Sequence, residues 1–187
     1  MTIKKPSNWL VVLYDVPDKP SKLKVRLWRE FKRIGALYPQ LSICLVPDNN
    51  ETRKNLENIE SLLNKNHKFS ALTAKGVRAK DQGKILGMLR VERDKRYEEI
   101  LEECQEFIDE INLNISNKKT TQEEAEEMEE VLEGLYRWLD RVKSIDWIDN
   151  SSTCVKVEKL LKKCRSIMNR FSELSHPQDA NSKNRLP

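Results

Sequence analysis

The chain has little glycine, few aromatic residues and no long apolar run. Of its 187 residues only five are glycine, and aromatic residues make up 6%. This composition disfavours an all-β sandwich and favours helix. The longest apolar run, Trp9–Leu13, is much shorter than the roughly 20 residues that cross a membrane. The opening residues MTIKKPSN lack the apolar segment of a signal peptide, so we expect a cytoplasmic protein with no membrane partner.

Patterns that bind metals or catalyse reactions are also scarce. The chain has two histidines, and its four cysteines, none in a C-x-x-C pair, are Cys44, Cys104, Cys154 and Cys164. Because a zinc site needs four clustered ligands, we expect no metal and no cofactor, and we interpret the cysteines as small apolar residues. The sequence has no glycine-rich phosphate loop, no catalytic-triad pattern and no HExxH motif. It therefore favours a non-enzymatic protein.

What the sequence does contain is charge, and the charge is unevenly distributed. Charged residues make up 34% of the chain and hydrophobic residues 38%, which is typical of a globular protein. Residues 1–97 carry 21 Lys/Arg against 10 Asp/Glu, whereas residues 98–187 carry 13 against 20. A basic front and an acidic rear suggest two parts with different partners. The front suits an anion, either nucleic acid or a small oxyanion.

The front alternates strand and helix patterns. Short apolar runs predict three strands, at 9–14, 40–46 and 68–74. Helical spacing predicts two helices between them, at 22–36 and 51–66. We expect residues 8–80 to form a ferredoxin-like βαββαβ domain, for whose fourth strand Val77–Arg78 is the remaining candidate.

From residue 81 onward the pattern is helical, which makes the whole chain an α+β protein. Apolar residues spaced alternately by four and three positions form three successive heptad seams. The seams consist of Tyr97, Leu101, Cys104, Ile108 and Ile111; of Met128, Leu132, Leu135, Leu139 and Val142; and of Val157, Leu161, Cys164, Met168 and Phe171. We expect an antiparallel bundle of three helices over residues 81–174, followed by a disordered tail over 175–187.

The predicted helix at 22–36 carries the clearest functional signal. Four of its cations fall on one ridge beside or opposite the apolar stripe, namely Lys22, Arg26, Arg29 and Arg33. Like charges at this spacing repel one another, and such a ridge matches the phosphates of a nucleic acid or focuses a small anion. The alternative is a solvated face that improves solubility. The next candidates for anion binding are Lys75 and Arg78, which follow the third strand.

Two other groups of residues have a structural interpretation. The segment RVERDKR, from Arg90 to Arg96, is expected to form ion pairs along a helix surface. The four tryptophans are interpreted as core residues rather than as stacking platforms for bases. They are Trp9, Trp28, Trp138 and Trp147.

Asp15 stands at the end of the first predicted strand. A carboxylate at such a position binds Mg²⁺ if a second carboxylate or a symmetry mate supplies more oxygens. The nearest carboxylate in sequence is Asp18. On the residues alone, Asp15 starts a turn before a proline.

The opening stretch and the helical rear together carry a family resemblance. In the front it rests on Pro20–Ser21, Val25, Trp28, Arg29, Gly35–Ala36, Gln40, Ser42 and Val46–Pro47. In the rear it rests on the segments RDKRYEEILEECQEFIDEI, EEMEEVLEGLYRWLDRVKSIDWI and VEKLLKKCRSIMNRF. Over roughly residues 8–174 the chain resembles the N-terminal domain of the ChrB family of chromate-resistance regulators.

This resemblance implies a cytoplasmic transcription regulator that binds promoter DNA and responds to chromate or another oxyanion. Larger family members carry a further C-terminal domain, and we expect a standalone form that lacks it. We also expect a homodimer.

Two alternatives remain open. A strand ending in YDVP before a basic helix is similar to small CRISPR-associated adaptation proteins, which are ferredoxin-like homodimers, and to the middle domain of the phenylacetate repressor family. These resemblances cover about 70 residues, and the first implies a metal-dependent nuclease in which Asp15 is catalytic. The other alternative is a non-catalytic interaction module whose acidic bundle binds a protein partner.

Overall fold

The computed structural model describes residue 6 and residues 8–16, 21–40, 43–63, 67–75, 78–148 and 151–175. The chain divides into two compact units. The first comprises Met1–Arg93 and Ile145–Asp149, and the second comprises Asp94–Ser144 and Asn150–Pro187. Apart from Ser175, the predicted tail lies outside the described residues. In the described part of the chain, no helix is both long and apolar enough to cross a membrane.

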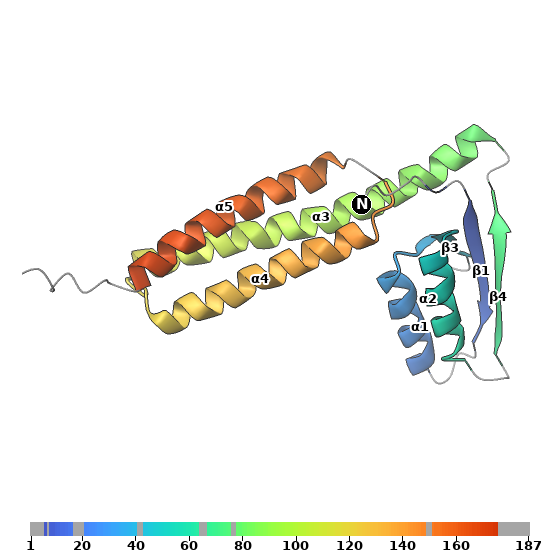
Figure 1. Cartoon of the computed structure of the whole chain (residues 1–187), viewed down its shortest axis with the longest axis horizontal. Helices are drawn as coiled ribbons and strands as arrows, with labels where there is room; N and C mark the ends of the chain where they lie inside the picture. Colours follow the sequence, from blue (N-terminus) through green and yellow to red (C-terminus); the bar gives the residue numbers. More distant parts are fainter. Residues whose placement is uncertain are drawn as a thin grey trace, which may run out of the picture. The chain divides into compact units, whose positions relative to one another are not determined.

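The fold is α+β, with four strands and five helices in the described ranges (Figure 1). The elements of the front are β1 (Trp9–Asp15), α1 (Ser21–Arg33), β2 (Leu37–Gln40), β3 (Ile43–Pro47), α2 (Asn50–Glu60) and β4 (Lys68–Ala74). The helices that follow are α3 (Ala79–Ser116), α4 (Gln122–Ser144) and α5 (Ser152–Ser175). The predicted boundary at residue 80 falls in the first turn of α3.

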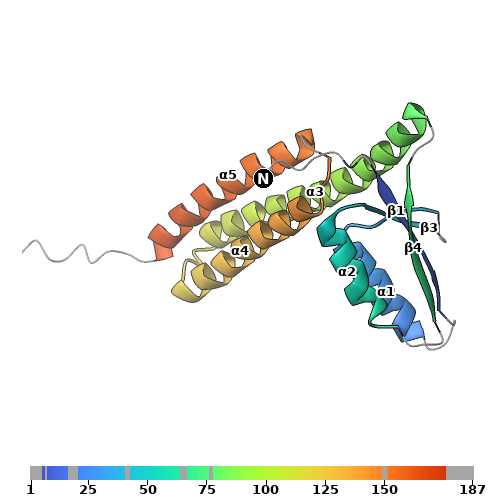
Figure 2. The same ribbon diagram turned by 45° about the vertical axis from the view of Figure 1, so that its right-hand side comes forward.

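The sheet of the first unit has the order β2-β3-β1-β4, and all its pairs are antiparallel. Helices α1 and α2 lie side by side on one face of it (Figures 1 and 2). Alternation along the strands separates two apolar clusters. On the helix-covered face lie Leu10, Val12, Leu27, Phe31, Cys44, Val46, Leu56 and Ile59. On the other face Trp9, Leu37 and Leu45 pack against Leu89 of α3 and Ile148.

The strand missing from the sequence prediction is β2, which precedes β3. Its four residues, LYPQ, include Pro39, and its register with β3 is irregular between Leu37 and Gln40. Proline is confined to edge strands, and β2 is an edge strand. Of the candidate for a fourth strand at Val77–Arg78, Val77 lies outside the described residues, and Arg78 directly precedes α3 and is not in a strand.

Arg93 is buried in the first unit, with 1% of its surface exposed. Its Nη2 donates to the carbonyl oxygen of Gly35 at 2.6 Å, and its Nε donates to that of Ile145 at 3.0 Å. The guanidinium also lies 5.6 Å from the ring centroid of Trp147. One side chain thus joins three segments that are far apart in the sequence.

Gly35 occupies a position beside Arg93 where a residue with a side chain would not fit. Its φ of +76° lies in the left-handed region that favours glycine. A Cβ there would come within 2.9 Å of Arg93 Nη2 and of the side chains of Ile145 and Trp147. Hydrogen bonds from Gly35 N to Lys32 O and from Ala36 N to Phe31 O end α1 in a Schellman motif.

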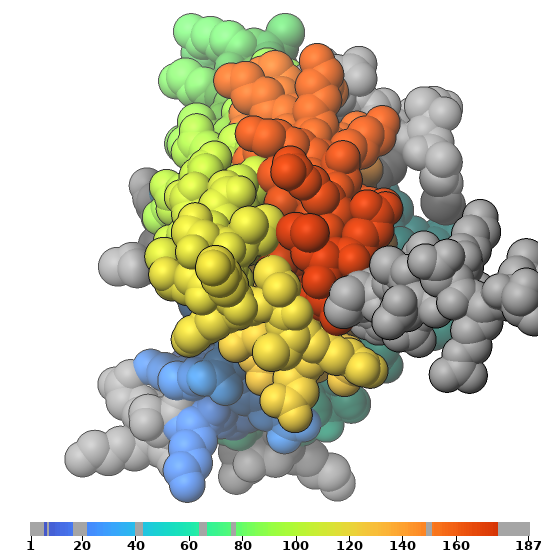
Figure 3. Space-filling view, turned by 90° about the vertical axis from the view of Figure 1, so that its left-hand side faces the viewer, coloured from blue at the N-terminus to red at the C-terminus, as the bar shows by residue number. Residues whose placement is uncertain are grey.

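The second unit is a bundle of α4, α5 and the part of α3 from Asp94 onward, packed around one apolar cluster. The predicted seam residues are confirmed as its core: Leu101 is partly buried and all the others are buried. Side chains of α3 and α5 lie against one another on the face shown in Figure 3. Cys104 and Cys164 meet inside, where the Cys164 thiol donates to Cys104 O at 3.6 Å. The interpretation of these two cysteines as core residues is confirmed.

Two interpretations of side chains were wrong. Trp28 is 51% exposed, although Trp9 is buried and both Trp138 and Trp147 pack against apolar clusters. The expectation that RVERDKR lies along a helix surface is wrong at Arg93, which is buried, although Arg93 does form an ion pair with Glu92 within the segment at 3.6 Å. Its neighbour Glu92 forms an ion pair with Lys32 Nζ on α1 at 2.7 Å.

We expect Arg93→Met to lower the free energy of unfolding of the first unit by about 2–5 kcal/mol, because two buried carbonyl oxygens lose their donor. Urea unfolding followed by tryptophan fluorescence measures this change. The matched control is Arg90→Met, which changes an exposed arginine one turn earlier in α3. Equal midpoints for the two variants would contradict the structural role of Arg93.

Candidate functional site

The cation ridge consists of Lys22, Arg26, Arg29 and Arg33, and all four are exposed on α1. Their spacing of four, three and four residues places them on one face of the helix. The opposite face is buried against the sheet through Leu27 and Phe31, which are 1% and 0% exposed. The amphipathic pattern of α1 therefore fixes which way the ridge faces within the first unit.

Within the described residues, one of the four ridge cations forms an ion pair. Arg33 pairs with Glu30 at 2.8 Å, one turn earlier. Among the residues that the structure describes, no ion pair involves Lys22, Arg26 or Arg29. The first turn of α1 has no acidic residue, so the charge of Lys22 adds to the positive end of the helix dipole. The ridge is a concentrated positive surface, and repulsion between its cations slightly destabilises the helix.

An exposed aromatic side chain lies on the flank of α1, about 100° around the helix from Arg29. Trp28, at 51% exposed, and Val25, at 45%, stand one turn apart on α1. The sequence interpretation missed Trp28 as a surface residue. A helical wheel contains the signal, since Trp28 projects about 100° from the middle of the stripe formed by Leu23, Leu27, Phe31 and Ile34. Basic side chains next to an exposed tryptophan are typical of nucleic-acid surfaces.

Lys75 and Arg78 are exposed but belong to another part of the first unit. Both follow the edge strand β4, and within the described ranges no hydrogen bond or ion pair joins them to the ridge. Arg78 donates twice to the carboxylate of Asp81, at 2.7 and 3.0 Å. This bidentate pair reduces what Arg78 can offer to an anion.

Asp15 is exposed at the end of β1, in register with Lys68 of β4. Asp18, its nearest carboxylate in sequence, lies outside the described residues. Within the ranges that the structure describes, no group of three or more His, Cys, Asp or Glu could hold a metal ion.

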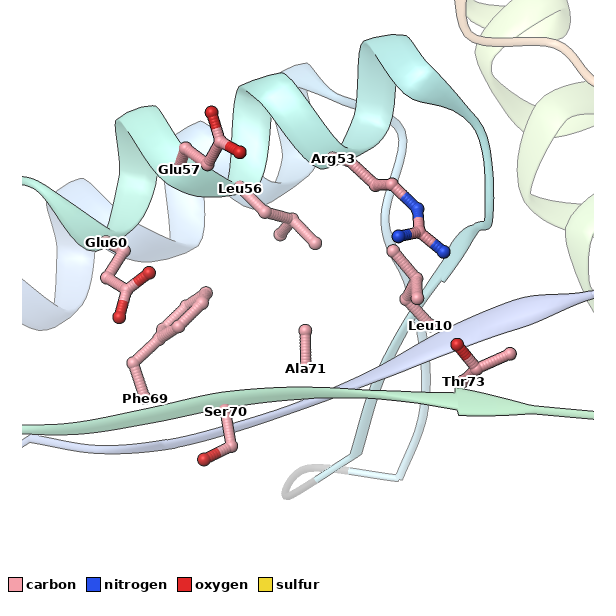
Figure 4. Close-up of a pocket in the computed structure, with 9 residues that line it drawn as sticks. All are labelled: Leu10, Arg53, Leu56, Glu57, Glu60, Phe69, Ser70, Ala71 and Thr73. Carbon is pink, nitrogen blue, oxygen red and sulfur yellow. The ribbon is translucent and has the colours of Figure 1, made fainter.

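A pocket of about 340 Å³ lies between α2 and β4 (Figure 4). Leu10, Leu56, Phe69 and Ala71 form its apolar part, and Glu57, Glu60 and Arg53 contribute charge. Arg53 forms a bidentate ion pair with Asp48, at 2.6 and 3.0 Å, which lowers the pKa of that carboxyl. With two glutamates and a neutralised arginine, the pocket does not suit a dianionic oxyanion.

Cys44 is a buried thiol on β3. Burial raises its pKa to about 12, so the thiol stays protonated at neutral pH and is a poor nucleophile. Cys44 is 1% exposed and packs in the apolar cluster under α1 and α2. The interpretation of Cys44 as a small apolar residue is confirmed.

Comparison with protein families places most of the chain in one of them. Residues 24–181 match the family model described as protein ChrB, N-terminal. The matched range contains Arg26, Arg29 and Arg33 of the ridge, whereas Asp15 precedes it. No curated protein matches the chain. The chain belongs to the ChrB N-terminal family, which associates it with chromate resistance.

Proposed function

We propose that this protein is a cytoplasmic, non-enzymatic transcription regulator that binds promoter DNA through the cation ridge of α1 and responds to chromate or another oxyanion. The observation that carries the DNA part is the ridge itself: Lys22, Arg26 and Arg29 are exposed on one face without an ion pair in the described part of the chain. Family membership supports the chromate part.

The dimensions of the ridge support contact with a duplex. From Lys22 to Arg33 the helix rises by about 16 Å, at 1.5 Å per residue. Over that length a DNA duplex presents several phosphates, and each cation that neutralises one releases a counterion. Trp28 is exposed on the flank of α1 next to Val25, between the ridge and the buried stripe.

The front is proposed to be a ferredoxin-like domain. Its elements follow the β-α-β-β-α-β order of that motif. Both helices cover one face of the sheet, which leaves the ridge of α1 directed away from the strands.

We expect Arg26→Ala/Arg29→Ala to weaken binding to duplex DNA by about tenfold or more at low salt, because two phosphate contacts are lost. Fluorescence anisotropy with a labelled duplex from the promoter of this gene measures the affinity. The matched control is Lys159→Ala/Lys162→Ala, which removes two exposed lysines at the same spacing from α5. Equal affinities for the two double variants would contradict the proposal, as would no binding by the unmodified protein.

Chromate is expected to release the protein from promoter DNA. The control is sulfate, a tetrahedral dianion of the same charge, at equal concentration. Release by chromate alone supports a specific response. An equal response to both anions would show only the effect of ionic strength and would overturn this part of the proposal.

Incubation with single- and double-stranded DNA and RNA, over a series of divalent metals and pH values, tests the nuclease alternative. A non-enzymatic regulator leaves these substrates intact. Metal-dependent cleavage that disappears in Asp15→Asn would instead favour the nuclease and overturn the assignment as non-enzymatic.

A further inference from the structure

Within the part of the chain that the structure describes, the outer edge of β4 is a long unpaired strand edge. β4 lies at one end of the sheet, has seven residues, and pairs with β1 without irregularity. Five of its seven residues are exposed: Lys68, Ser70, Ala71, Leu72 and Thr73. Such an edge presents a row of backbone donors and acceptors, which is a template for another strand.

The opposite edge of the same sheet is protected. β2 has only four residues, contains Pro39 and is irregular against β3. Short length, proline and a bulge are the devices by which proteins prevent edge pairing. β4 has none of them; its one lysine, Lys68, is its first residue, and Lys75 directly follows its last.

Apolar side chains are exposed beside this edge. Leu72 is 55% exposed and stands opposite Val11, whereas Leu13, at 46%, is diagonal to it on the same face of the sheet. A strand added to β4 would cover Leu72 and extend the sheet over this patch.

We propose that the partner is a second copy of this chain, whose β4 pairs antiparallel with the first across a twofold axis at Ala71. This register alone pairs all seven residues: Ala71 faces Ala71, Ser70 faces Leu72, and Lys68 faces Ala74 of the other copy. The axis is perpendicular to the sheet, so both copies of α2 lie on the same side and run antiparallel.

The charges of α2 are arranged for this symmetry. Figure 4 shows Leu56 over Ala71, with Arg53 toward Thr73 and Glu60 toward Phe69. The twofold axis at Ala71 therefore brings the Arg53 end of each α2 toward the Glu60 end of the other. The pair with Asp48 uses Nε and Nη2 of Arg53, so Nη1 is the donor that would reach Glu60 of the other copy at the two outer positions, and Glu57 faces its own copy near the axis.

The same geometry separates the two copies of Asp15. Asp15 pairs with Lys68, and Lys68 of one copy lies six residues along the strand from Lys68 of the other. The two copies of β1 are also three strand spacings apart. Together these offsets separate the two Asp15 residues by about 25 Å. This distance is too long for one metal ion to join them. The proposed dimer is thus incompatible with a metal shared by two Asp15 side chains, and it does not depend on DNA binding.

A cysteine at the axis tests the register directly. Directly opposite residues of an antiparallel pair have Cα atoms about 4.5–5.5 Å apart, which suits a disulfide. In the full chain, Ala71→Cys is expected to give a disulfide-linked dimer under mild oxidation on a non-reducing gel. Leu113→Cys, at a site 59% exposed on α3, and the unmodified chain are expected to remain uncrosslinked. Equal crosslinking of all three proteins, or none by Ala71→Cys, would overturn the register.

Sedimentation velocity tests the dimer itself. We expect the unmodified protein to have twice the 22.0 kDa mass of the chain, and Leu72→Lys to weaken dimerisation at least about tenfold, because it places charge against the partner strand. If Leu72→Lys misfolds, Ser70→Lys, also at an exposed position of β4, is the second test of the same edge. Leu113→Lys, on α3, is the control. Glu57→Gln is expected to tighten the dimer. A monomer at all concentrations, or a dimer that neither lysine variant weakens, would overturn the proposal.

Discussion

The first unit depends on the buried guanidinium of Arg93. Its hydrogen bonds to Gly35 and Ile145 span 58 and 52 residues of sequence, and they hold the end of α1 against α3 and the segment at 145–148. A buried cation without such partners would cost several kcal/mol, so the carbonyl oxygens and Arg93 require one another. The turn that receives Arg93 also ends α1. The direction in which α1 presents its cations therefore depends on a residue that lies far from them in sequence.

The features that could be predicted from the sequence are those set by local periodicity. The β4 strand, the seams of the bundle and the ridge of α1 each follow from a repeat of two or of about 3.6 residues. The four ridge residues indeed share one exposed face of α1, whereas Lys75 and Arg78 stand apart from them.

What could not be predicted depends on distant partners or on context. Arg93 lies in a charged segment, and nothing local marks it as buried, since its acceptors come from other parts of the chain. β2 resembles a loop because it is four residues long and contains Pro39, and it is a strand only by pairing with β3. Trp28 was assigned to the core because it flanks the apolar-periodic positions of α1, although its angle on the helix places it outside the apolar stripe. For Arg93 and β2, tertiary context overrode a local preference.

The account of function rests on electrostatics: a cation ridge with few neutralising partners, on a member of a chromate-resistance family, contacts DNA phosphates. The most direct measurement is the affinity of the unmodified protein for a promoter duplex as a function of salt concentration. The account predicts that the logarithm of the association constant falls linearly with the logarithm of salt, with a slope of about −3 or steeper for three or more neutralised phosphates. A slope near zero, or no measurable binding at low salt, would contradict it.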